Sequence, residues 1–496
     1  MTSHEPSSSR PLSIPLAILP LIFLVALLAF IISLFGSDSL SGGSQIALLL
    51  TSGLCYFLAR VTRKTPWETF EKAITRQIAG VAPAILLLMF IGALSGCWMI
   101  SGVVPTLIYY GMQILHPSFF LVSCCIICAL VSTMTGSSWT TVATIGIALI
   151  GIGRAQGFDD GWIAGAIISG AYFGDKISPL SDTTVLASST ARVPLFQHIR
   201  YLFITTIPAL LIALTVFTIA GLMHSPQTAE QTAAVAVALK DRFCITPWLL
   251  LVPVATGILI AKRVPPIVTL FLSALLAIFF ALIFQREALY EIAAMPQHDG
   301  WALLKGSLIT TFGNTQLQSP NHELAELIAT RGMAGMLGTI WLILCAMCFG
   351  GSMIACGIIE TIGRAFRRLA QKRTSMVSST VGGGLFFNTV TADQYLSIIL
   401  TIELFRDIYE RNGYESRLLS RTAEDSVTVT SPLIPWNTCG MTQATVLNVP
   451  TLTYLPYCVF NYVCPMVSIV IAATGYKIFR RTQPAGATTE PQAARP

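Results

Sequence analysis

Long apolar runs constrain this chain more than any other feature. Seven runs of roughly 18–25 residues are uninterrupted, one is shorter, and four are broken by polar residues. About 20 apolar residues in a helix cross the hydrocarbon core of a bilayer, where backbone groups must bond within the segment. Only 11% of the residues are charged, against about 25% in soluble domains. We therefore expect an all-α polytopic membrane protein, and composition excludes a soluble enzyme, a nucleic-acid binder and a disordered scaffold. The uninterrupted runs are 12–35, 44–61, 81–100, 199–222, 265–284, 336–359 and 455–479, the short one is 247–262, and the broken ones are 118–153, 161–192, 375–406 and 417–449.

Basic residues predict the orientation. The 36–43 loop has none, whereas the 60–76 loop, the 364–373 segment and the residues after 476 are rich in Lys and Arg. Cytoplasmic loops carry such an excess, so both termini are expected in the cytoplasm. The assignments agree only if 118–153 begins and ends outside and 375–406 begins and ends inside, each as a broken hairpin. His198 is expected in a cytoplasmic loop, and Glu360 in an interfacial salt bridge.

An internal repeat divides the chain. The pattern Glu68-x-x-Glu71-x-x-x-Thr75-Arg76 recurs 255 residues later, and Ser178-Pro179-Leu180 recurs 253 residues later at 431–433. At that second offset, 135–141 falls on 388–394. With the charge rule the two copies have opposite orientation, which is the inverted-topology repeat of many secondary transporters. The predicted organisation is a cytoplasmic tail 1–11, a first repeat 12–222, a linker 223–246, an inverted second repeat 247–480 and a disordered cytoplasmic tail 481–496.

The polar break at 135–141 is the first candidate transport site. Broken helices are tolerated at membrane depth where they line a cavity or bind an ion. Hydroxyl and carbonyl oxygens suit a hard cation such as Na+, although Ser and Thr also serve as packing residues between membrane helices. The candidate cation-shell positions here are Thr135, Gly136, Ser137, Ser138 and Thr140.

The break at 174–184 adds ionisable groups. Asp175 and Asp182 flank Ser178-Pro179, and Pro179 frees a backbone carbonyl. Ionisable residues inside membrane segments are functional candidates by default. Either carboxylate could exchange a proton for a cation, and that competition alone gives antiport. Lys176 is a candidate counter-charge, with a purely structural Asp–Lys pair as the alternative.

The second half repeats the arrangement. Asp393 lies in the break at 388–394, and Glu424 and Asp425 precede the break at Ser431-Pro432. Asp393 is the strongest candidate, while Glu424 and Asp425 could instead sit at the inner interface near Arg421. We expect the 135–141 and 388–394 breaks to face each other near the midplane and sodium to bind at the carboxylates. The remaining candidate positions of this half are Asn388, Thr391, Ser431, Pro432 and Asn437.

Three stretches resemble a known family. TGSSWTTVATIGIALIGIG, GAIISGAYFGDKISPLSDTT and EDSVTVTSPLIPWNTCG are similar to the NhaC Na+/H+ antiporters of the ion transporter superfamily, and the resemblance covers roughly 12–480. It implies sodium extrusion driven by proton entry across a bacterial cytoplasmic membrane. The family also contains malate/lactate exchangers coupled to Na+ and H+, so a Na+-coupled organic-acid exchanger remains the alternative. No arginine lies within a break, which disfavours a dicarboxylate.

Other classes fit the sequence less well. A passive channel needs no inverted repeat, and the spans show no catalytic His, Cys or metal cluster that an enzyme would use. The expected partners are Na+ and H+ as substrates and the lipid bilayer, with no cofactor and no nucleic acid. A homodimer is left open.

Overall fold

The membrane spans form as long helices. A computed structural model describes residues 12–35, 42–223, 229–317 and 328–480, so both predicted tails lie outside the described residues. Within these ranges the chain is helical, with only two isolated β-bridges. Among the described residues, eight helices are long and apolar enough to cross a membrane, or up to ten if two bent pairs each count as one span. The all-α polytopic class is confirmed.

The first half runs from α1 to α10. The α3 helix has 34 residues, well beyond the predicted 81–100 span, because its charged first turns continue the helix from Trp67 after Pro66. The predicted 60–76 loop is therefore mostly helix. The elements are α1 Ile14–Phe35, α2 Gly43–Arg63, α3 Trp67–Ile100, α4 Val103–Ile114, η2 Pro117–Phe119, α5 Phe120–Thr135, α6 Ser138–Thr141, the π-helical η3 Val142–Gly146, α7 Ile147–Ala155, α8 Asp160–Ile177, α9 Asp182–Thr190 and α10 Leu195–Met223.

The second half follows the helix α11, Ala229–Arg242, which lies within the predicted linker. Its elements are η4 Pro247–Leu250, α12 Leu251–Ala261, α13 Pro266–Phe284, α14 Arg286–Ala293, α15 Gly300–Phe312, η5 Met333–Met336, α17 Leu337–Ala355, α18 Ile358–Leu369, α19 Arg373–Thr391, α20 Gln394–Arg411, α21 Ser416–Ala423, the π-helical η6 Glu424–Thr428, η7 Ser431–Leu433, α22 Thr438–Leu447, α23 Thr451–Tyr454, η8 Leu455–Tyr457 and α24 Val459–Thr474.

Both expected hairpins are present. The Gln156 side chain, just after α7, donates to the Leu115 carbonyl, just before α5, at 2.8 Å. The segment from α5 to α7 therefore returns to the end where it began. In the other half, the hydroxyls of Thr380 on α19 and Tyr409 on α20 are 3.1 Å apart, so α19 and α20 also start and finish at one end.

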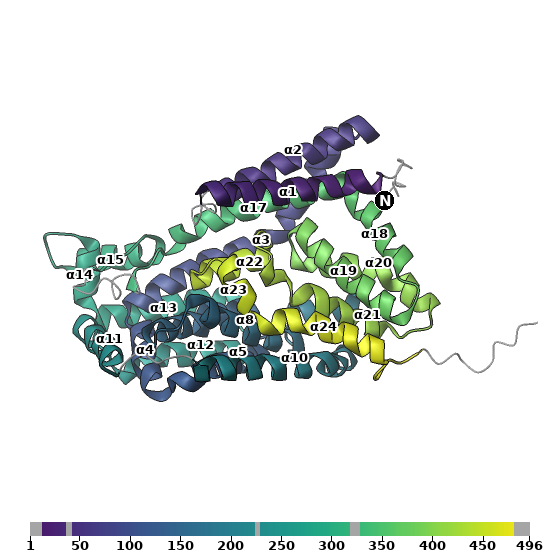
Figure 1. Ribbon diagram of the computed structural model, residues 1–496. Coiled ribbons are helices and arrows are strands. Elements are labelled where there is room, and N and C mark those ends of the chain that lie inside the picture. The colour runs from purple at the N-terminus through teal and green to yellow at the C-terminus, as the bar shows by residue number, and fades with distance from the viewer. Residues whose placement is uncertain (1–11, 36–41, 224–228, 318–327, 481–496) are drawn as a thin grey trace, which may run out of the picture.

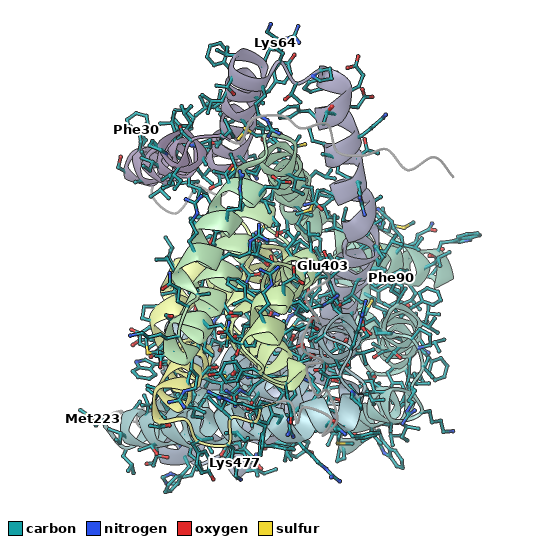
Figure 2. The ribbon with its side chains drawn as sticks, turned by 90° about the vertical axis from the view of Figure 1, so that its right-hand side faces the viewer. Phe30, Lys64, Phe90, Met223, Glu403 and Lys477 are labelled. Atoms are coloured by element: carbon teal, nitrogen blue, oxygen red, sulfur yellow. The ribbon has the colours of Figure 1, made fainter. Side chains whose placement is uncertain are left out.

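The two hairpins enter from opposite ends of the molecule. Gly221, near the end of α10, approaches the Ser118 carbonyl before α5. Arg373, at the start of α19, donates to the Ala472 carbonyl near the end of α24 at 2.7 Å. Figure 1 shows α18, α20 and the end of α24 at the right, together with the start of α1. Figure 2 looks onto that end, with the green helices that include Glu403 between the purple α1–α3 group and the yellow segment near Lys477. The inverted-topology repeat is confirmed.

The repeat register differs from the sequence expectation in the broken segments. Gly102 and Gly357 are both left-handed residues that begin α4 and α18, in line with the 255-residue offset. Further on, the bond between Thr135 and Thr141 hydroxyls is repeated by Thr391 and Ser397, at an offset of 256. The expected offset of 253 is wrong by three residues, because the matching Ser-Pro-Leu letters lie nearly one helical turn out of register.

Small residues allow the closest helix contacts around the site. The α5 and α8 helices run side by side in the same direction, with Gly170 against Cys125 and Gly174 against Ala129. A Cβ at Gly170 would lie 2.1 Å from the Cys125 carbonyl oxygen, so only glycine allows this approach. Cys124, Cys125 and Cys128 are fully buried in this region, as small packing residues.

Candidate functional site

The first break is a single left-handed turn between α5 and α6. Gly136 has φ +70° and ends α5. A Cβ there would lie 2.6 Å from the Leu180 backbone, so the position requires glycine for both reasons. Ser137 then caps α6 by accepting a hydrogen bond from the Thr140 amide at 3.2 Å. The break is short: residues 138–141 are already helical.

Asp175 is the carboxylate that this turn holds. One of its oxygens accepts the Ser138 amide at 3.1 Å and the Ser138 hydroxyl at 2.6 Å. The other accepts the Ser181 hydroxyl at 2.6 Å. The residue is only 6% exposed. The start of α6 and two hydroxyls therefore compensate a negative charge that would otherwise be expensive at this depth.

The second break is the counterpart of the first. Ala392, with φ +57°, occupies the place of Gly136. Asp393 follows as the cap of α20 and accepts the Leu396 amide at 2.8 Å, as Ser137 does in α6. Residues 388–391 remain helical, so the break spans only Ala392 and Asp393 rather than all of 388–394. The non-helical part is smaller than expected because α19 continues through Thr391.

The two breaks face each other across one cavity. Its volume is about 600 Å³, and both Asp175 and Asp393 line it. Asp182, which is exposed, lies on its wall as the first residue of α9. The expectation that the breaks face each other is confirmed. Other lining residues are Thr135, Gly136, Ser137, Trp139, Thr140, Thr183, Gln394, Tyr395 and Thr438 from the broken segments, Gly80, Pro83 and Leu87 from α3, Arg263 and Pro265 from the α12–α13 turn, and Thr269 from α13.

A second cavity lies on the other side of α22. It has a volume of about 390 Å³ and is lined by Arg154, Arg331 and Asn448 among others. Along α3, the first cavity contacts residues 80–87 and the second contacts 91–108 of α3 and α4. Thr438 at the start of α22 lines the first cavity, while Met441 and Thr445 line the second. About one turn of α22 thus separates the two cavities, which lie toward opposite ends of the molecule.

Lys176 points away from the first cavity into a buried ion pair. Its ammonium donates to Asp425 and, at 2.9 Å, to the Cys464 sulfur. The Thr205 hydroxyl donates to the same Asp425 oxygen at 2.8 Å. Both charged side chains are fully buried. Asp425 and Lys176 therefore belong to an internal network, which we call the ion-pair network, and not to the cavity wall.

Arg421 joins this network, and sequence reasoning placed it wrongly. It was expected at the inner interface, yet its side chain is fully buried, with Nε 3.7 Å from Asp425. Its guanidinium carbon lies 4.5 Å from the centre of the Tyr201 ring, as in a cation–π contact. The α21 helix packs against α10, α19 and α20, and the Arg421 side chain is fully buried among them.

His198 is likewise misplaced by the sequence expectation. It lies within α10 and is fully buried, with Nδ1 2.8 Å from the Ser420 hydroxyl. The helix begins at Leu195, four residues earlier than the apolar run, so it includes this polar start. The basic residues on either side of His198 in the sequence, Arg192 and Arg200, did not indicate that its side chain is buried. Glu424 is also fully buried rather than interfacial.

Several predicted ligands form hydrogen bonds to other groups of the protein. Asn388 donates to the Val427 carbonyl at 2.7 Å, and Asn437 donates to the Asn388 carbonyl at 3.1 Å. The Ser431 hydroxyl donates to Gln394, at 2.6 Å. The Pro432 carbonyl accepts from the Tyr454 hydroxyl at 2.7 Å.

The remaining predicted positions support the turns. The Ser178 hydroxyl donates to the Thr133 carbonyl at 2.8 Å, Pro179 is exposed, and Thr391 bonds within its own turn. Neither proline lines the first cavity. The carbonyls that the two prolines free belong to the preceding helical turn, so their role as cation ligands stays a prediction.

Comparisons with known proteins agree on one family. The model of the Na+/H+ antiporter family matches residues 11–193 and 170–476. The chain is 33% identical to the Na+/H+ antiporter NhaC of Bacillus subtilis, over 94% of this chain and 98% of that one. It is 34% identical to the malate-2H+/Na+-lactate antiporter of the same organism, over 82% and 85%. It is 31% identical to the arginine/ornithine antiporter ArcD of Halobacterium salinarum, over 97% of both.

Proposed function

This chain belongs to the Na+/H+ antiporter family, and we propose that it exchanges cytoplasmic Na+ for external H+ across a bacterial cytoplasmic membrane. In this proposal both termini are cytoplasmic, and the first cavity, beside the α12–α13 turn with its Lys262-Arg263 pair, is open to the cytoplasm. The observation that carries the proposal is the pair of broken helices that bring Asp175 and Asp393 to one cavity.

The chemistry follows from the cost of charge. An ionised carboxylate at membrane depth costs roughly 2.5–3.5 kcal/mol on insertion scales, so a site without Na+ favours the uptake of a proton. Na+ offsets that cost with its own charge when oxygens complete its shell. Asp175, Asp393, the Thr135–Thr140 turn and Thr438 supply oxygen atoms on the wall of the cavity. Binding of one ion therefore disfavours the other, which is the requirement for exchange.

A second substrate class fits the same cavity. A volume of about 600 Å³ far exceeds what a single Na+ occupies and falls within the usual range for organic ligands, about 300–1,000 Å³. Arg263 lines it as well, so the absence of arginine from the breaks does not leave an organic anion without a positive partner. A Na+-coupled organic-acid exchanger, like the malate/lactate relative, is the second candidate.

Transport in proteoliposomes tests both. Vesicles loaded with a pH-sensitive dye receive Na+, with choline as the control cation, in the absence and presence of malate or lactate. We expect Na+ alone to drive proton movement, and both Asp393→Asn and the double variant Asp175→Asn/Asp182→Asn to abolish it. Proton flux that requires the organic acid would favour the second candidate. Undiminished flux in both variants would refute the proposed site.

A further inference from the structure

Glu424 is a buried carboxylate with no hydrogen-bond partner. It is the first residue of the π-helical segment η6, is fully buried, and neither of its oxygens is hydrogen-bonded within the described part of the chain. Thr428 lies one turn on, and its hydroxyl is near enough to act on the Glu424 carboxylate, although among the described residues the two form no hydrogen bond of normal geometry. π-Helical turns are rare and occur frequently at functional sites. A buried, ionised carboxylate without partners is expensive, so Glu424 needs a proton or a compensating charge.

The charges around Glu424 come from the transport site and from the ion-pair network. Asp175 and Lys176 of α8 act on it, as does Asp425 in its own turn. The other elements packed against η6 carry further charged or titratable groups: the Cys464 thiol on α24, Arg417 and Arg421 on α21, Asp182 on α9, and Glu403, Arg406, Asp407, Glu410 and Arg411 on α20. The α19 helix has no acidic residue, and its single basic residue, Arg373, bonds the end of α24. The charges of Asp175, which lines the cavity, and of the Lys176–Asp425 pair therefore all reach Glu424.

Glu424 itself does not line either cavity. A Na+ in either cavity therefore does not touch Glu424, whereas a proton can reach it along a chain of polar groups. Such groups continue from Glu424 toward the end of the molecule where α21 begins. In the described part of the chain, the Arg421 nitrogens, one Asp425 oxygen, the Ser468 hydroxyl and His198 Nε2 are buried without hydrogen-bond partners, and His198 Nδ1 contacts Ser420. Buried polar atoms of this kind are normally satisfied by internal water.

We propose that Glu424 holds the exchanged proton while the cavity is empty of Na+, and that this proton leaves through the ion-pair network and not through the cavity. The inference rests on the proposed function and adds which group carries the proton. Asp175 and Glu424 repel each other when both are ionised, so one proton is shared by the pair in the empty state. Na+ beside Asp175 removes that repulsion, and the proton is released from Glu424. The two ions then follow separate routes and need not pass each other.

The test measures Na+ affinity against pH in the purified full-length protein, by calorimetry, together with Na+/Na+ exchange in proteoliposomes. For the natural protein we expect apparent Na+ affinity to fall about tenfold per pH unit on the acidic side of its range. Glu424→Gln removes the titrating group, so its affinity should change less than about threefold per unit while Na+/Na+ exchange persists. Glu403→Gln, at an exposed position on α20, is the matched control and should behave as the natural protein.

A conservative variant distinguishes the loss of a titrating group at position 424 from a disturbance of the packing there. Glu424→Asp keeps a carboxylate and should keep the steep pH dependence, and it also serves if Glu424→Gln does not fold. The proposal is overturned if Glu424→Gln retains the tenfold dependence, if it folds but loses Na+/Na+ exchange, or if Glu424→Asp loses the dependence. A natural protein that binds no Na+ would instead refute the proposed function, which keeps the two failures distinct.

Discussion

The ion-pair network gives a prediction whose order of effects follows from its geometry. Asp425 is one anion between two buried cations: it is hydrogen-bonded to Lys176, and its second oxygen is 3.7 Å from Arg421 Nε. Lys176→Met removes one cation and leaves Arg421 to pair with Asp425. Asp425→Asn removes the anion that pairs with both cations in the described part of the chain. The second change should therefore destabilise the protein more than the first.

The expected size follows from buried pairs in general. Breaking such a pair by removing one partner costs about 3–5 kcal/mol, because the other charge is left uncompensated. We expect Lys176→Met at the low end, about 3 kcal/mol, and Asp425→Asn at 5 kcal/mol or more, since it strands two cations. The double variant Lys176→Met/Asp425→Asn strands only Arg421, so it should be more stable than Asp425→Asn alone.

Reversible unfolding in mixed detergent micelles, followed by tryptophan fluorescence, measures all three variants in a double-mutant cycle. Arg242→Met at the partly exposed Arg242–Glu291 pair is the control and should cost less than about 1 kcal/mol. If Asp425→Asn costs no more than Lys176→Met, the two-cation argument is wrong. If neither exceeds the control, the network is not a buried pair in the membrane-embedded protein.

Three further outcomes follow from the site. Gly136→Ala should lower the free energy of unfolding by at least about 1–2 kcal/mol, the cost of a left-handed residue with a Cβ, and should abolish exchange. The control Gly53→Ala, where a Cβ meets nothing within 4 Å, should be neutral. Equal melting temperatures of the two variants would refute this prediction. Ser138→Ala removes the 2.6 Å hydrogen bond to Asp175. Calorimetry should show Na+ binding weakened by about 1.5–3 kcal/mol, roughly tenfold to a hundredfold. An unchanged Na+ affinity would exclude Asp175 as the ligand. In a cysteine-depleted protein, Cys at Arg154 and at the exposed Arg367 should react with a membrane-impermeant reagent from opposite sides of the membrane, and labelling from one side would contradict the inverted repeat.

The fold was predictable because it depends on patterns that extend over many residues. Apolar length and the placement of basic residues predict helices, hairpins and their inverted arrangement. The details that failed depend on single turns. Arg421 and His198 look like loop residues because they neighbour other basic residues, yet α21 and the start of α10 are packed inside the protein. A charged residue one turn before an acidic pair, as Arg421 is before Asp425, was the available sign of an internal ion pair.

The register of the repeat shows the same limit. Matching letters placed Asp393 beside the Gly-Ser break at an offset of 253, but hydrogen bonds pair the halves at 256. The correct register makes Ser431 the counterpart of Asp175, since Ser138 bonds Asp175 as Gln394 bonds Ser431. The symmetry of the backbone is thus broken by its carboxylates: each half contributes one Asp where the other half has Ser. At each of these two positions a Ser hydroxyl makes the corresponding hydrogen bond in the other half of the chain. The backbone turn therefore does not require a carboxylate, and the presence of Asp175 and Asp393 needs another explanation.

That asymmetry leads to a test that distinguishes the role of Asp393 as a helix cap from its role as a cation ligand. Asp393 caps α20 through the Leu396 amide, and Ser137 caps α6 in the same way through Thr140. Asp and Ser are about equally good caps, so Asp393→Ser should change the free energy of unfolding by less than about 0.5 kcal/mol. It removes one negative charge from the cavity, and Na+-driven proton flux should fall at least tenfold if the carboxylate binds the cation. Asp393→Ala, which lacks the cap, should lose both stability and transport. A fully active Asp393→Ser protein would show that Asp393 only ends the break, and the cation site would then rest on Asp175 and Asp182 alone.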